Sequence, residues 1–342
     1  MHQPLTATPA PDAPTEAATI VIVGNGMVGE RLLAELQRAG LLRTHRVVVV
    51  GEERRPAYDR VHLSSYVEGA SAEDLSVADA SLHAHPAVRV LLGQRVADID
   101  RAARVVRTDA GVEVTYDHLV LCTGSAPFVP PIPGRDADGC HVYRTIEDLD
   151  GIVADAAGTE RGVVIGGGLL GLEAANALRL LGLAVSVVEF APRLMPRQLD
   201  QMGSDALRGR VEELGIAVHT DTVTEAILTD DRGRVSQLRF ADGTLLDAQL
   251  VCFSAGIRPR DELARAAGIR VSDRGGVAVG ASLTTEDPRV HAIGECASVD
   301  GMVYGLVGPG YAMAKVLANR LAGGDATFGG ADMSTSLKLL GV

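Results

Sequence analysis

Two glycine-rich turns have the residue types and the spacing that bind the phosphates of a nucleotide. Each follows an apolar strand pattern and has the form G-x-G-x-x-G, at residues 24–29 and, 142 residues later, at residues 166–171. In such a turn the first glycine allows the bend, the second admits a pyrophosphate, and the third lets helix and strand pack closely. The following helix N-terminus adds partial positive charge. Two turns predict two dinucleotides, as hydride transfer from a nicotinamide to a flavin requires.

Both turns lie in the same order of elements, which ends at an acidic residue. After the first turn an apolar helical face carries Leu32, Leu33 and Leu36, and a strand at 46–50 leads to Glu52, 23 residues beyond the third glycine. After the second turn, a helix and a strand at 184–188 lead to Glu189, 18 residues beyond its third glycine. An acid at this spacing accepts the hydroxyls of an adenosine ribose. Glycine-rich turns in an ordinary α/β sheet would not explain both acids.

Composition limits the class of protein. The chain has 342 residues, 46% of them apolar, and a net charge of −12. This length allows two or three α/β domains, and the charge argues against nucleic acid or an anionic membrane as a partner. No apolar run approaches a membrane span, and residues 1–17 read as a disordered lead and not as a signal peptide. We therefore expect a cytoplasmic protein.

The four cysteines, Cys122, Cys140, Cys252 and Cys296, are scattered and form no C-x-x-C motif. This spacing predicts neither a disulfide framework nor a metal site. A flavin enzyme that reduces disulfides needs a reactive cysteine after the second strand, where this chain has the cysteine-free segment 58–65. Because Cys122 and Cys252 end apolar strand patterns, we expect buried, unreactive thiols there.

The second half of the chain repeats the first at the level of a domain. A strand at 88–96, a meander and a buried strand ending at residue 124 are echoed by a strand at 217–219, a hairpin and a strand ending at residue 256. A last strand ending in Glu295, with no counterpart in the second repeat, belongs beside the first nucleotide, and a helix at 311–321 follows it. The fold class is therefore α/β, with two Rossmann-like domains, the second inserted in the first. The predicted boundaries are 18–128 with 258–330 for the first domain, 144–257 for the second, and 331–342 for the start of a following region.

The order of these motifs resembles the two-dinucleotide flavoprotein reductases, which include rubredoxin and ferredoxin reductases and the glutathione-reductase-like superfamily. Six longer strings, at 57–65, 143–149, 189–195, 256–260, 292–297 and 337–342, narrow the resemblance. Together they look like the N-terminal part of the large subunit of assimilatory NAD(P)H nitrite reductase. The resemblance covers nearly the whole chain, from about residue 19 onward.

The resemblance implies FAD in the first site and NAD(P)H in the second. On the FAD side it implies Gly24, Gly26, Met27 and Gly29 at the pyrophosphate, Glu52 at the adenosine ribose, Arg60 and Val96 near the adenine half, Thr123 and Gly124 against the cofactor, and Gly294 and Glu295 at the ribityl chain. Glu295 is a departure, because many relatives have Asp there. On the nicotinamide side it implies Gly166, Gly168, Leu169, Leu170 and Gly171 at the pyrophosphate, Glu189 at the adenosine ribose, and Glu173 and Gly256 near the nicotinamide.

Glu189 favours NADH over NADPH, because a carboxylate accepts ribose hydroxyls and repels a 2′-phosphate. Arg193 and Arg197 follow closely in the sequence. They would either pair with the 2′-phosphate and so allow NADPH to bind, or serve only as surface charge on a loop. We name no side chain as a catalytic acid or base, since the cofactors carry the chemistry.

The related nitrite reductases continue into iron–sulfur and sirohaem regions, for which this chain lacks the cysteine clusters. The leading hypothesis is therefore an NADH-oxidising FAD module that passes electrons to a downstream iron–sulfur/sirohaem region. A stand-alone NADH:rubredoxin or ferredoxin reductase, serving a separate electron-carrier protein, is the alternative. A nucleotide-sensing redox regulator without turnover is a third.

Overall fold

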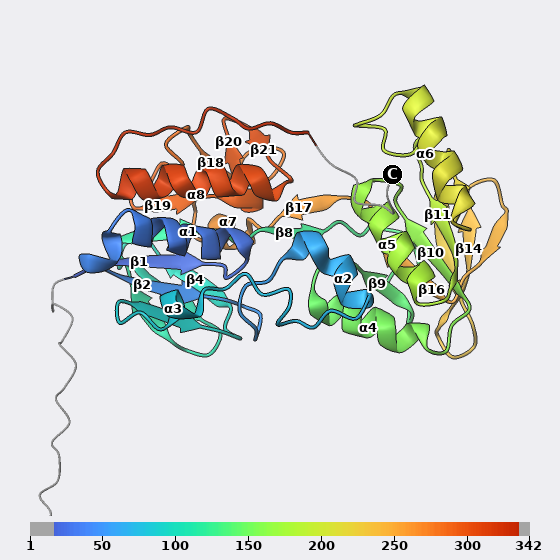
Figure 1. Cartoon of the computed structure of the whole chain (residues 1–342), viewed down its shortest axis with the longest axis horizontal. Helices are drawn as coiled ribbons and strands as arrows, with labels where there is room; N and C mark the ends of the chain where they lie inside the picture. The colour runs from blue at the N-terminus through green and yellow to red at the C-terminus, as the bar shows by residue number, and fades with distance from the viewer. Residues whose placement is uncertain (1–16, 335–342) are drawn as a thin grey trace, which may run out of the picture. The chain divides into compact units, whose positions relative to one another are not determined.

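The computed structural model describes residues 17–334, which form two compact units (Figure 1). Within the described residues, the first unit contains 17–57, 77–124 and 259–332, and the second contains 58–76, 125–258 and 333–334. The first unit is therefore built from three separate stretches of chain. The predicted lead and the predicted following region lie largely outside the described residues, at 1–16 and 335–342.

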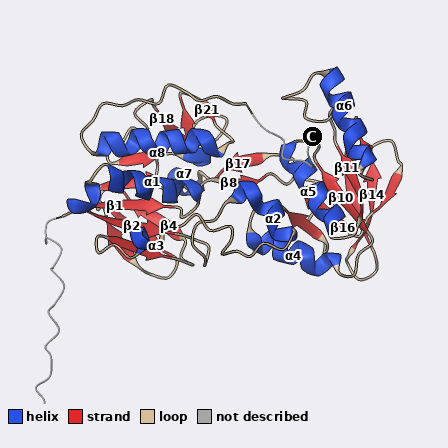
Figure 2. Cartoon of the chain, in the orientation of Figure 1, coloured by secondary structure: helices blue, strands red, loops and turns tan. Residues whose placement is uncertain are grey.

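The first unit is centred on a parallel sheet of five strands (Figure 2). In spatial order the strands are β19 (Val290–Ala292), β7 (His118–Leu121), β1 (Ala18–Val23), β2 (His45–Val50) and β3 (Val88–Leu91). The Val, Ile and Leu side chains of the four strands other than the edge strand β3 are buried on both faces, as a parallel sheet covered on both sides requires. Because β19 pairs with β7, the last strand of the chain's α/β pattern returns to the first sheet.

Two helices pack side by side in the first unit, α1 (Met27–Arg38) and α8 (Val307–Leu321). Leu32, Leu33 and Leu36 of α1 are buried as their spacing predicts. A Cβ at Gly310 would lie 2.6 Å from Val28 Cγ2, so this glycine lets the helices approach closely. Helix α8 begins four residues before the predicted start at 311. Gly308 and Pro309 fall in its first turn, where proline is tolerated.

The predicted strand at 88–96 is wrong in one respect, because the structure divides it. Strand β3 ends at Leu91, and β4 begins at Val96 in a different sheet. Gly93 has a φ of +67° and makes the turn between them, where its N–H donates to Glu53 O. The residues of the turn, Gly93, Gln94 and Arg95, are not apolar, so the apolar pattern ends within one residue of the end of the strand.

The other elements of the first unit are short and lie at its margins. Three antiparallel strand pairings, one parallel pairing and four short helical turns contribute to its hydrophobic core or cover it. They are β4 (Val96–Asp100), β5 (Val105–Thr108), β6 (Glu113–Thr115), β18 (Val277–Val279), β20 (Ala297–Val299), β21 (Met302–Val303), α3 (Ala80–His83), α7 (Glu262–Ala266), η1 (Leu41–Arg43) and η3 (Gly294–Cys296).

The second unit repeats the plan with its own five-stranded parallel sheet. Its strands in spatial order are β12 (Ala217–His219), β11 (Ala184–Val188), β10 (Arg161–Ile165), β16 (Leu250–Phe253) and β9 (Cys140–Val142). Alternate residues face two separate cores: Val164 and Cys252 pack in the core of the helices, while Val163 and Val251 pack in the core of the antiparallel strands. The sheet is thus covered on both faces.

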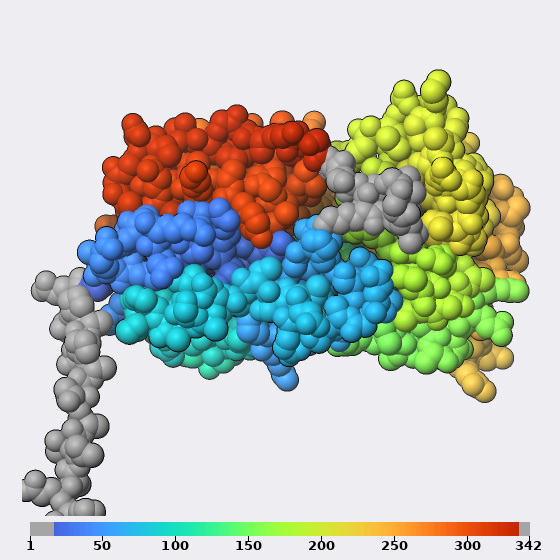
Figure 3. Space-filling model, in the orientation of Figure 1, coloured from blue at the N-terminus to red at the C-terminus, as the bar shows by residue number. Residues whose placement is uncertain are grey.

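The helices of the second unit are α4 (Ile146–Ala156), α5 (Leu169–Leu180) and α6 (Gln201–Glu213), and the antiparallel strands are β13 (Thr224–Thr229), β14 (Val235–Phe240) and β15 (Leu245–Asp247). Helix α6 lies at the surface of the unit, where Met202 is 82% exposed (Figure 3). Two short strands, β8 (Ser125–Pro127) and β17 (Ile257–Pro259), pair with each other.

Residues 58–76 pack with the second unit, although the predicted boundaries place them in the first domain. This segment contains η2 (Arg60–His62) and α2 (Leu63–Val67), and α2 contacts α4 and α5. The Tyr58 hydroxyl accepts a hydrogen bond from Ile146 N at 3.3 Å, and the Tyr66 hydroxyl donates to Asp150 Oδ1 at 2.7 Å. Sequence order alone does not reveal this attachment.

A buried histidine pair in the first unit predicts a loss of stability in mild acid. His291 is 5% exposed, and its Nε2 lies 3.2 Å from Nδ1 of His118. Burial, together with the neighbouring His118, lowers the pKa of His291 to about 3. Burial also lowers the pKa of His118. The folded state thus holds His291 neutral, whereas the unfolded chain protonates it below about pH 6.5.

Stability from His291 is therefore present above pH 6.5 and is lost as the pH falls toward 3. We expect the free energy of unfolding of the first unit to fall by about 2 kcal/mol between pH 7 and pH 5. Urea unfolding at each pH measures it. The His291→Gln variant should be less stable at pH 7 but should have a flatter pH profile. A profile as steep as that of the wild type would contradict the assignment.

Candidate functional site

The first glycine-rich turn lies directly after β1, at the carboxyl edge of the first unit's sheet. Gly24 has a φ of +118°, and a Cβ there would overlap the backbone carbonyl oxygen of Cys122. A Cβ at Gly29 would overlap the carbonyl oxygen of Gly24, whereas a Cβ at Gly26 would meet nothing within 4 Å. Two of the glycines are thus required by the backbone itself. The open space at Gly26 is what a pyrophosphate needs.

Unpartnered polar groups surround this turn. Both side-chain amide atoms of Asn25 are buried without a hydrogen-bond partner. Helix α1 begins at the turn with Gly26 as its N-cap and Met27 as its first residue, and no side chain caps it. The backbone N–H groups of its first turn can therefore donate to an anion. The turn fits the pyrophosphate of a dinucleotide.

The acids predicted for the first site follow strands of the same sheet. Glu52 comes two residues after β2, and Gly294 and Glu295 follow β19. Because the strands are parallel, their carboxyl ends share one edge with the first turn. The Glu52 side chain is 46% exposed, and its Oε2 lies 2.5 Å from Nη2 of Arg260.

Thr123 and Gly124 follow β7 at this same edge. The Thr123 hydroxyl donates to Arg260 O at 2.6 Å, and Gly124 has a φ of +70°. Gly294, with a φ of +78°, donates its N–H to the Met313 sulfur at 3.3 Å. A Cβ at Gly294 would lie 3.3 Å from Val28. The turns after β7 and β19 are therefore closely packed around the start of α1.

The two residues predicted for the adenine half belong to different units. Val96 is buried at the start of β4. Arg60 lies in η2, in the segment that packs with the second unit, and its guanidinium carbon is 5.2 Å from the ring centroid of Tyr58. The structure thus places Arg60 outside the first unit.

The second turn has the same geometry at the carboxyl end of β10. Gly166 has a φ of +122°, and a Cβ there would overlap the carbonyl oxygen of Ser254. A Cβ at Gly171 would overlap the carbonyl oxygen of Gly166, whereas a Cβ at Gly168 would meet nothing within 4 Å. Gly168 is the N-cap of α5, and no side chain caps that helix. The second site is therefore built like the first.

Glu189 is held beside the second turn by backbone hydrogen bonds. It is 5% exposed, and its Oε2 accepts from Gly167 N at 2.6 Å while its Oε1 accepts from Ala191 N at 2.9 Å. The N–H of Met195 donates to Gly167 O at 3.0 Å, so the loop after β11 is attached to the turn at two points. The carboxylate charge is thereby fixed in place, with lone pairs left on both oxygens.

The two arginines after Glu189 differ in their surroundings. Arg193 donates from Nε to Leu199 O at 3.2 Å, and Arg197 is exposed. The backbone bond orients the Arg193 side chain along its own loop. A role for either residue with a 2′-phosphate stays a prediction.

The remaining residues of the predicted nicotinamide set lie near the ends of β10 and β16. Leu169 and Leu170 open α5, and Glu173 follows one turn later, half-buried. Gly256 follows β16 with a φ of +108° and open space where a Cβ would be. Tyr143 follows the neighbouring β9, and its hydroxyl is buried without a hydrogen-bond partner.

The cysteines are free, and three of the four are buried. Burial raises the pKa of Cys252 to about 12 and raises the pKa values of Cys122 and Cys296 as well. The expectation of buried thiols at Cys122 and Cys252 is confirmed, and thiols in this state are poor nucleophiles.

Within residues 17–334, no group of three His, Cys, Asp or Glu side chains could hold a metal ion. In the same range, no helix is both long and apolar enough to cross a membrane.

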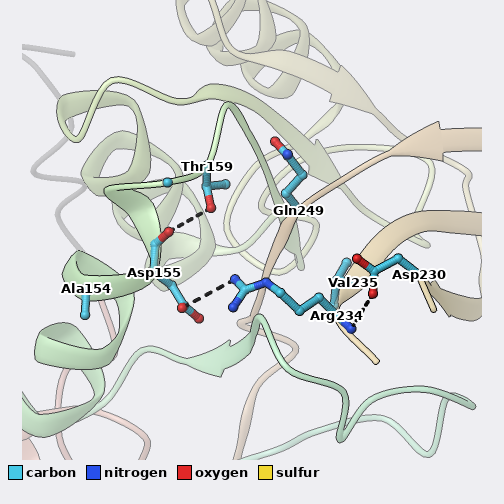
Figure 4. Close-up of a pocket in the computed structure, with 8 residues that line it drawn as sticks. Ala154, Asp155, Thr159, Asp230, Arg234, Val235 and Gln249 are labelled. Carbon is cyan, nitrogen blue, oxygen red and sulfur yellow. Dashed lines mark hydrogen bonds and ion pairs between the residues drawn. The ribbon is translucent and has the colours of Figure 1, made fainter. Parts of the chain in front are cut away.

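A polar hollow of about 380 Å³ lies at the opposite edge of the second sheet (Figure 4). It is lined by residues that precede β10 and β16, among them Thr159 and Gln249. Its polar groups pair with one another: Nη2 of Arg234 lies 3.4 Å from Oδ1 of Asp155, and the Thr159 hydroxyl donates to the backbone oxygen of Asp155. The hollow is thus separate from the nucleotide turn, and its charges already have partners.

Sequence reasoning missed two residues of the first site. Asn25 is a variable position of the motif, so only its burial reveals it. Arg260 reads in the sequence as part of a short basic group, 208 residues from Glu52. No sequence pattern could indicate that these two side chains meet.

Comparison with known proteins agrees with this geometry. Residues 18–316 match the family described as pyridine nucleotide-disulphide oxidoreductase. The chain is 53% identical to the nitrite reductase [NAD(P)H] large subunit of Klebsiella oxytoca and 47% identical to the nitrite reductase (NADH) large subunit of Escherichia coli K12. Each match covers 94% of this chain, which spans 34% and 38% of the two relatives.

A solved structure shares the architecture. The crystal structure of a ferredoxin reductase from Rhodopseudomonas palustris superimposes with a TM-score of 0.84 at 30% identity, covering 91% of this chain and 77% of that one. The predicted fold class and the resemblance to nitrite reductase large subunits are both confirmed. This chain belongs to the pyridine nucleotide-disulphide oxidoreductase family and is an FAD-dependent NAD(P)H oxidoreductase.

Proposed function

We propose that the chain is the NADH-oxidising module of an assimilatory nitrite reductase. The observation that carries this proposal is the pair of matched turns, each with an obligatory first and third glycine and open space at the second. Bound FAD would supply an acceptor for the hydride of NADH and release the electrons singly. The chain's own residues bind and orient the two nucleotides.

In the first unit, the dinucleotide would bind at the carboxyl edge of the parallel sheet. Gly24, Gly26, Met27 and Gly29 would enclose the pyrophosphate, and Asn25 would find in the ligand the hydrogen-bond partner that it lacks. The other proposed contacts are Glu52 to the adenosine ribose, Thr123 and Gly124 along the cofactor, Gly294 and Glu295 at the ribityl chain, and Arg60 and Val96 toward the adenine half.

In the second unit, Gly166, Gly168, Leu169, Leu170 and Gly171 would receive the pyrophosphate of the nicotinamide nucleotide. Glu189 would accept the adenosine ribose hydroxyls, and Glu173 and Gly256 would lie toward the nicotinamide. We propose NADH as the preferred donor, because the fixed and buried charge of Glu189 would face a 2′-phosphate.

The electrons would then leave this chain. No cysteine lies between residues 58 and 65, and the thiols at 122, 252 and 296 are free and buried. The aligned segment is only 34% and 38% of the length of these two relatives. We propose an iron–sulfur/sirohaem centre outside the chain as the acceptor, with nitrite reduced there.

The absorbance spectrum of the purified protein before and after anaerobic NADH tests the first half-reaction. We expect a flavin band that bleaches within the mixing time and returns when ferricyanide is added. A protein that neither carries nor binds flavin would refute the proposal. Flavin that binds without bleaching by NADH or NADPH would instead support the redox-regulator hypothesis.

A stand-alone ferredoxin or rubredoxin reductase is the second candidate, and the likeness to a ferredoxin reductase favours it. Turnover with a purified ferredoxin or rubredoxin, compared with turnover with the sirohaem region of a nitrite reductase, separates the two. Fast reduction of the small carrier alone would favour the second candidate.

A further inference from the structure

Arg260 has a fixed backbone at the edge of the first site. Its N–H donates to Gly124 O at 3.0 Å, and its carbonyl oxygen accepts from the Thr123 hydroxyl at 2.6 Å. The next residue, Asp261, is 6% exposed and accepts from Gly276 N at 2.6 Å. The Cα of Arg260 is therefore held from both sides.

The side chain of Arg260 reaches the acid that follows β2. Its Nη2 lies 2.5 Å from Oε2 of Glu52, while the two side chains are 39% and 46% exposed. The backbone before Glu52 is also fixed, because Gly51 N donates to Leu91 O and Gly51 O accepts from Gln94 N. An ordinary surface ion pair contributes little, since two mobile side chains must be ordered to form it. Here the fixed backbones hold the two side chains within reach of each other, so only the ordering of the side chains opposes the pair.

The Glu52–Arg260 pair lies where the adenosine ribose and the pyrophosphate of a dinucleotide would bind. Glu52 follows the strand whose last residue, Val50, accepts from Gly24 N at 2.9 Å, so the pair lies beside the first turn. The ion pair uses Oε2, which leaves Oε1 to accept a ribose hydroxyl. The guanidinium has further N–H donors, and its charge offsets that of the carboxylate beside a pyrophosphate with two negative charges.

We propose that Arg260 is an FAD-positioning residue, which holds the Glu52 carboxylate for the adenosine ribose and favours the pyrophosphate electrostatically. The inference rests on the proposed function of the first unit as the FAD site. It adds a basic residue to a site whose other proposed side chains are neutral or acidic, Arg60 excepted.

The test is the affinity of the flavin-free protein for FAD, followed by flavin fluorescence at two salt concentrations. We expect Arg260→Gln to weaken binding about tenfold and to reduce its salt dependence, and Arg260→Lys to recover part of the loss. The Glu52→Gln/Arg260→Gln double variant should bind no more weakly than the poorer single variant, because the two residues act together. Arg38→Gln is the matched control, since Arg38 forms a 2.7 Å ion pair with Glu35 on α1.

The outcomes separate the possible roles. If Arg260→Gln lowers the melting temperature but leaves FAD affinity unchanged, Arg260 only anchors the chain, and the inference is overturned. Tighter FAD binding by Arg260→Gln would mean that Arg260 competes with the ligand for the Glu52 carboxylate. This result would also overturn the inference. A wild-type protein that binds no FAD would overturn the proposed function and this inference with it.

Discussion

Replacing Gly24 by alanine is expected to abolish flavin binding and to destabilise the first unit by about 3–5 kcal/mol. Gly24 has a φ of +118°, which strains any residue with a side chain, and the added Cβ would overlap the carbonyl oxygen of Cys122. That carbonyl belongs to the turn after β7, so the overlap would separate β7 from β1 at the edge where the proposed site lies. Urea unfolding and flavin absorbance together measure both effects.

Gly26→Ala is the matched control for that variant, because it adds the same methyl group two residues away. A Cβ at Gly26 meets nothing within 4 Å, and its φ of −101° is open to any residue. We expect the free energy of unfolding of the flavin-free protein to change by no more than about 1 kcal/mol, the cost of a poorer N-cap. Affinity for FAD should nevertheless fall at least about tenfold, because the methyl group fills the space proposed for the pyrophosphate. Equal effects of the two substitutions on stability would contradict this division of roles.

Much of this fold could be predicted from the sequence because its signals are local. Strand, glycine turn, helix and acid follow one another within about 30 residues, and each has a backbone requirement that only a few residue types meet. Gly24 and Gly166 illustrate this, since their positive φ angles exclude other residues whatever the rest of the chain does. The second domain repeats the order of elements of the first, so each set of motifs supports the interpretation of the other.

The features that escaped prediction depend on contacts that are distant in sequence. Residues 58–76 pack with the second unit through contacts such as Tyr58 to Ile146, and hydrophobic periodicity does not encode a partner. The strand expected at 88–96 is divided because Gly93 turns the chain, and its N–H donates to Glu53 O in a distant part of the sequence. Arg260 reaches Glu52 only because the chain returns to the first sheet.

The presence of a carboxylate beside the second turn could be predicted from the sequence, but the hydrogen bonds that fix it could not. The sequence indicates an acid after β11, yet it does not show that Gly167 and Ala191 hold the Glu189 carboxylate through their N–H groups. This distinction matters, because a charge held by the backbone cannot turn away from a 2′-phosphate. We therefore expect any discrimination between the two nicotinamide nucleotides to be coupled to the stability of the loop.

Removing the Glu189 carboxylate should therefore change stability and nucleotide preference together. In Glu189→Ala the N–H groups of Gly167 and Ala191 lose their acceptor, and we expect unfolding of the second unit to become easier by about 2–5 kcal/mol. The KM for NADH should rise at least about tenfold as the ribose loses its acceptor. The ratio of kcat/KM for NADH to that for NADPH should fall by a similar factor. Glu213→Ala, which removes an exposed carboxylate paired with Arg210, is the control and should change none of these quantities.

Glu189→Gln separates the charge from the hydrogen bonds. Its amide oxygen can still accept from one N–H group, but its NH₂ faces the other donor, so stability should fall by less than in Glu189→Ala. Its nucleotide ratio should fall nearly as far, because the repulsion of a 2′-phosphate depends on the charge. Kinetics with both nucleotides and urea unfolding of both variants supply the four values needed. If the wild type already prefers NADPH, or if Glu189→Gln keeps the wild-type ratio, the fixed carboxylate does not set the preference, and Arg193 and Arg197 become the residues to vary.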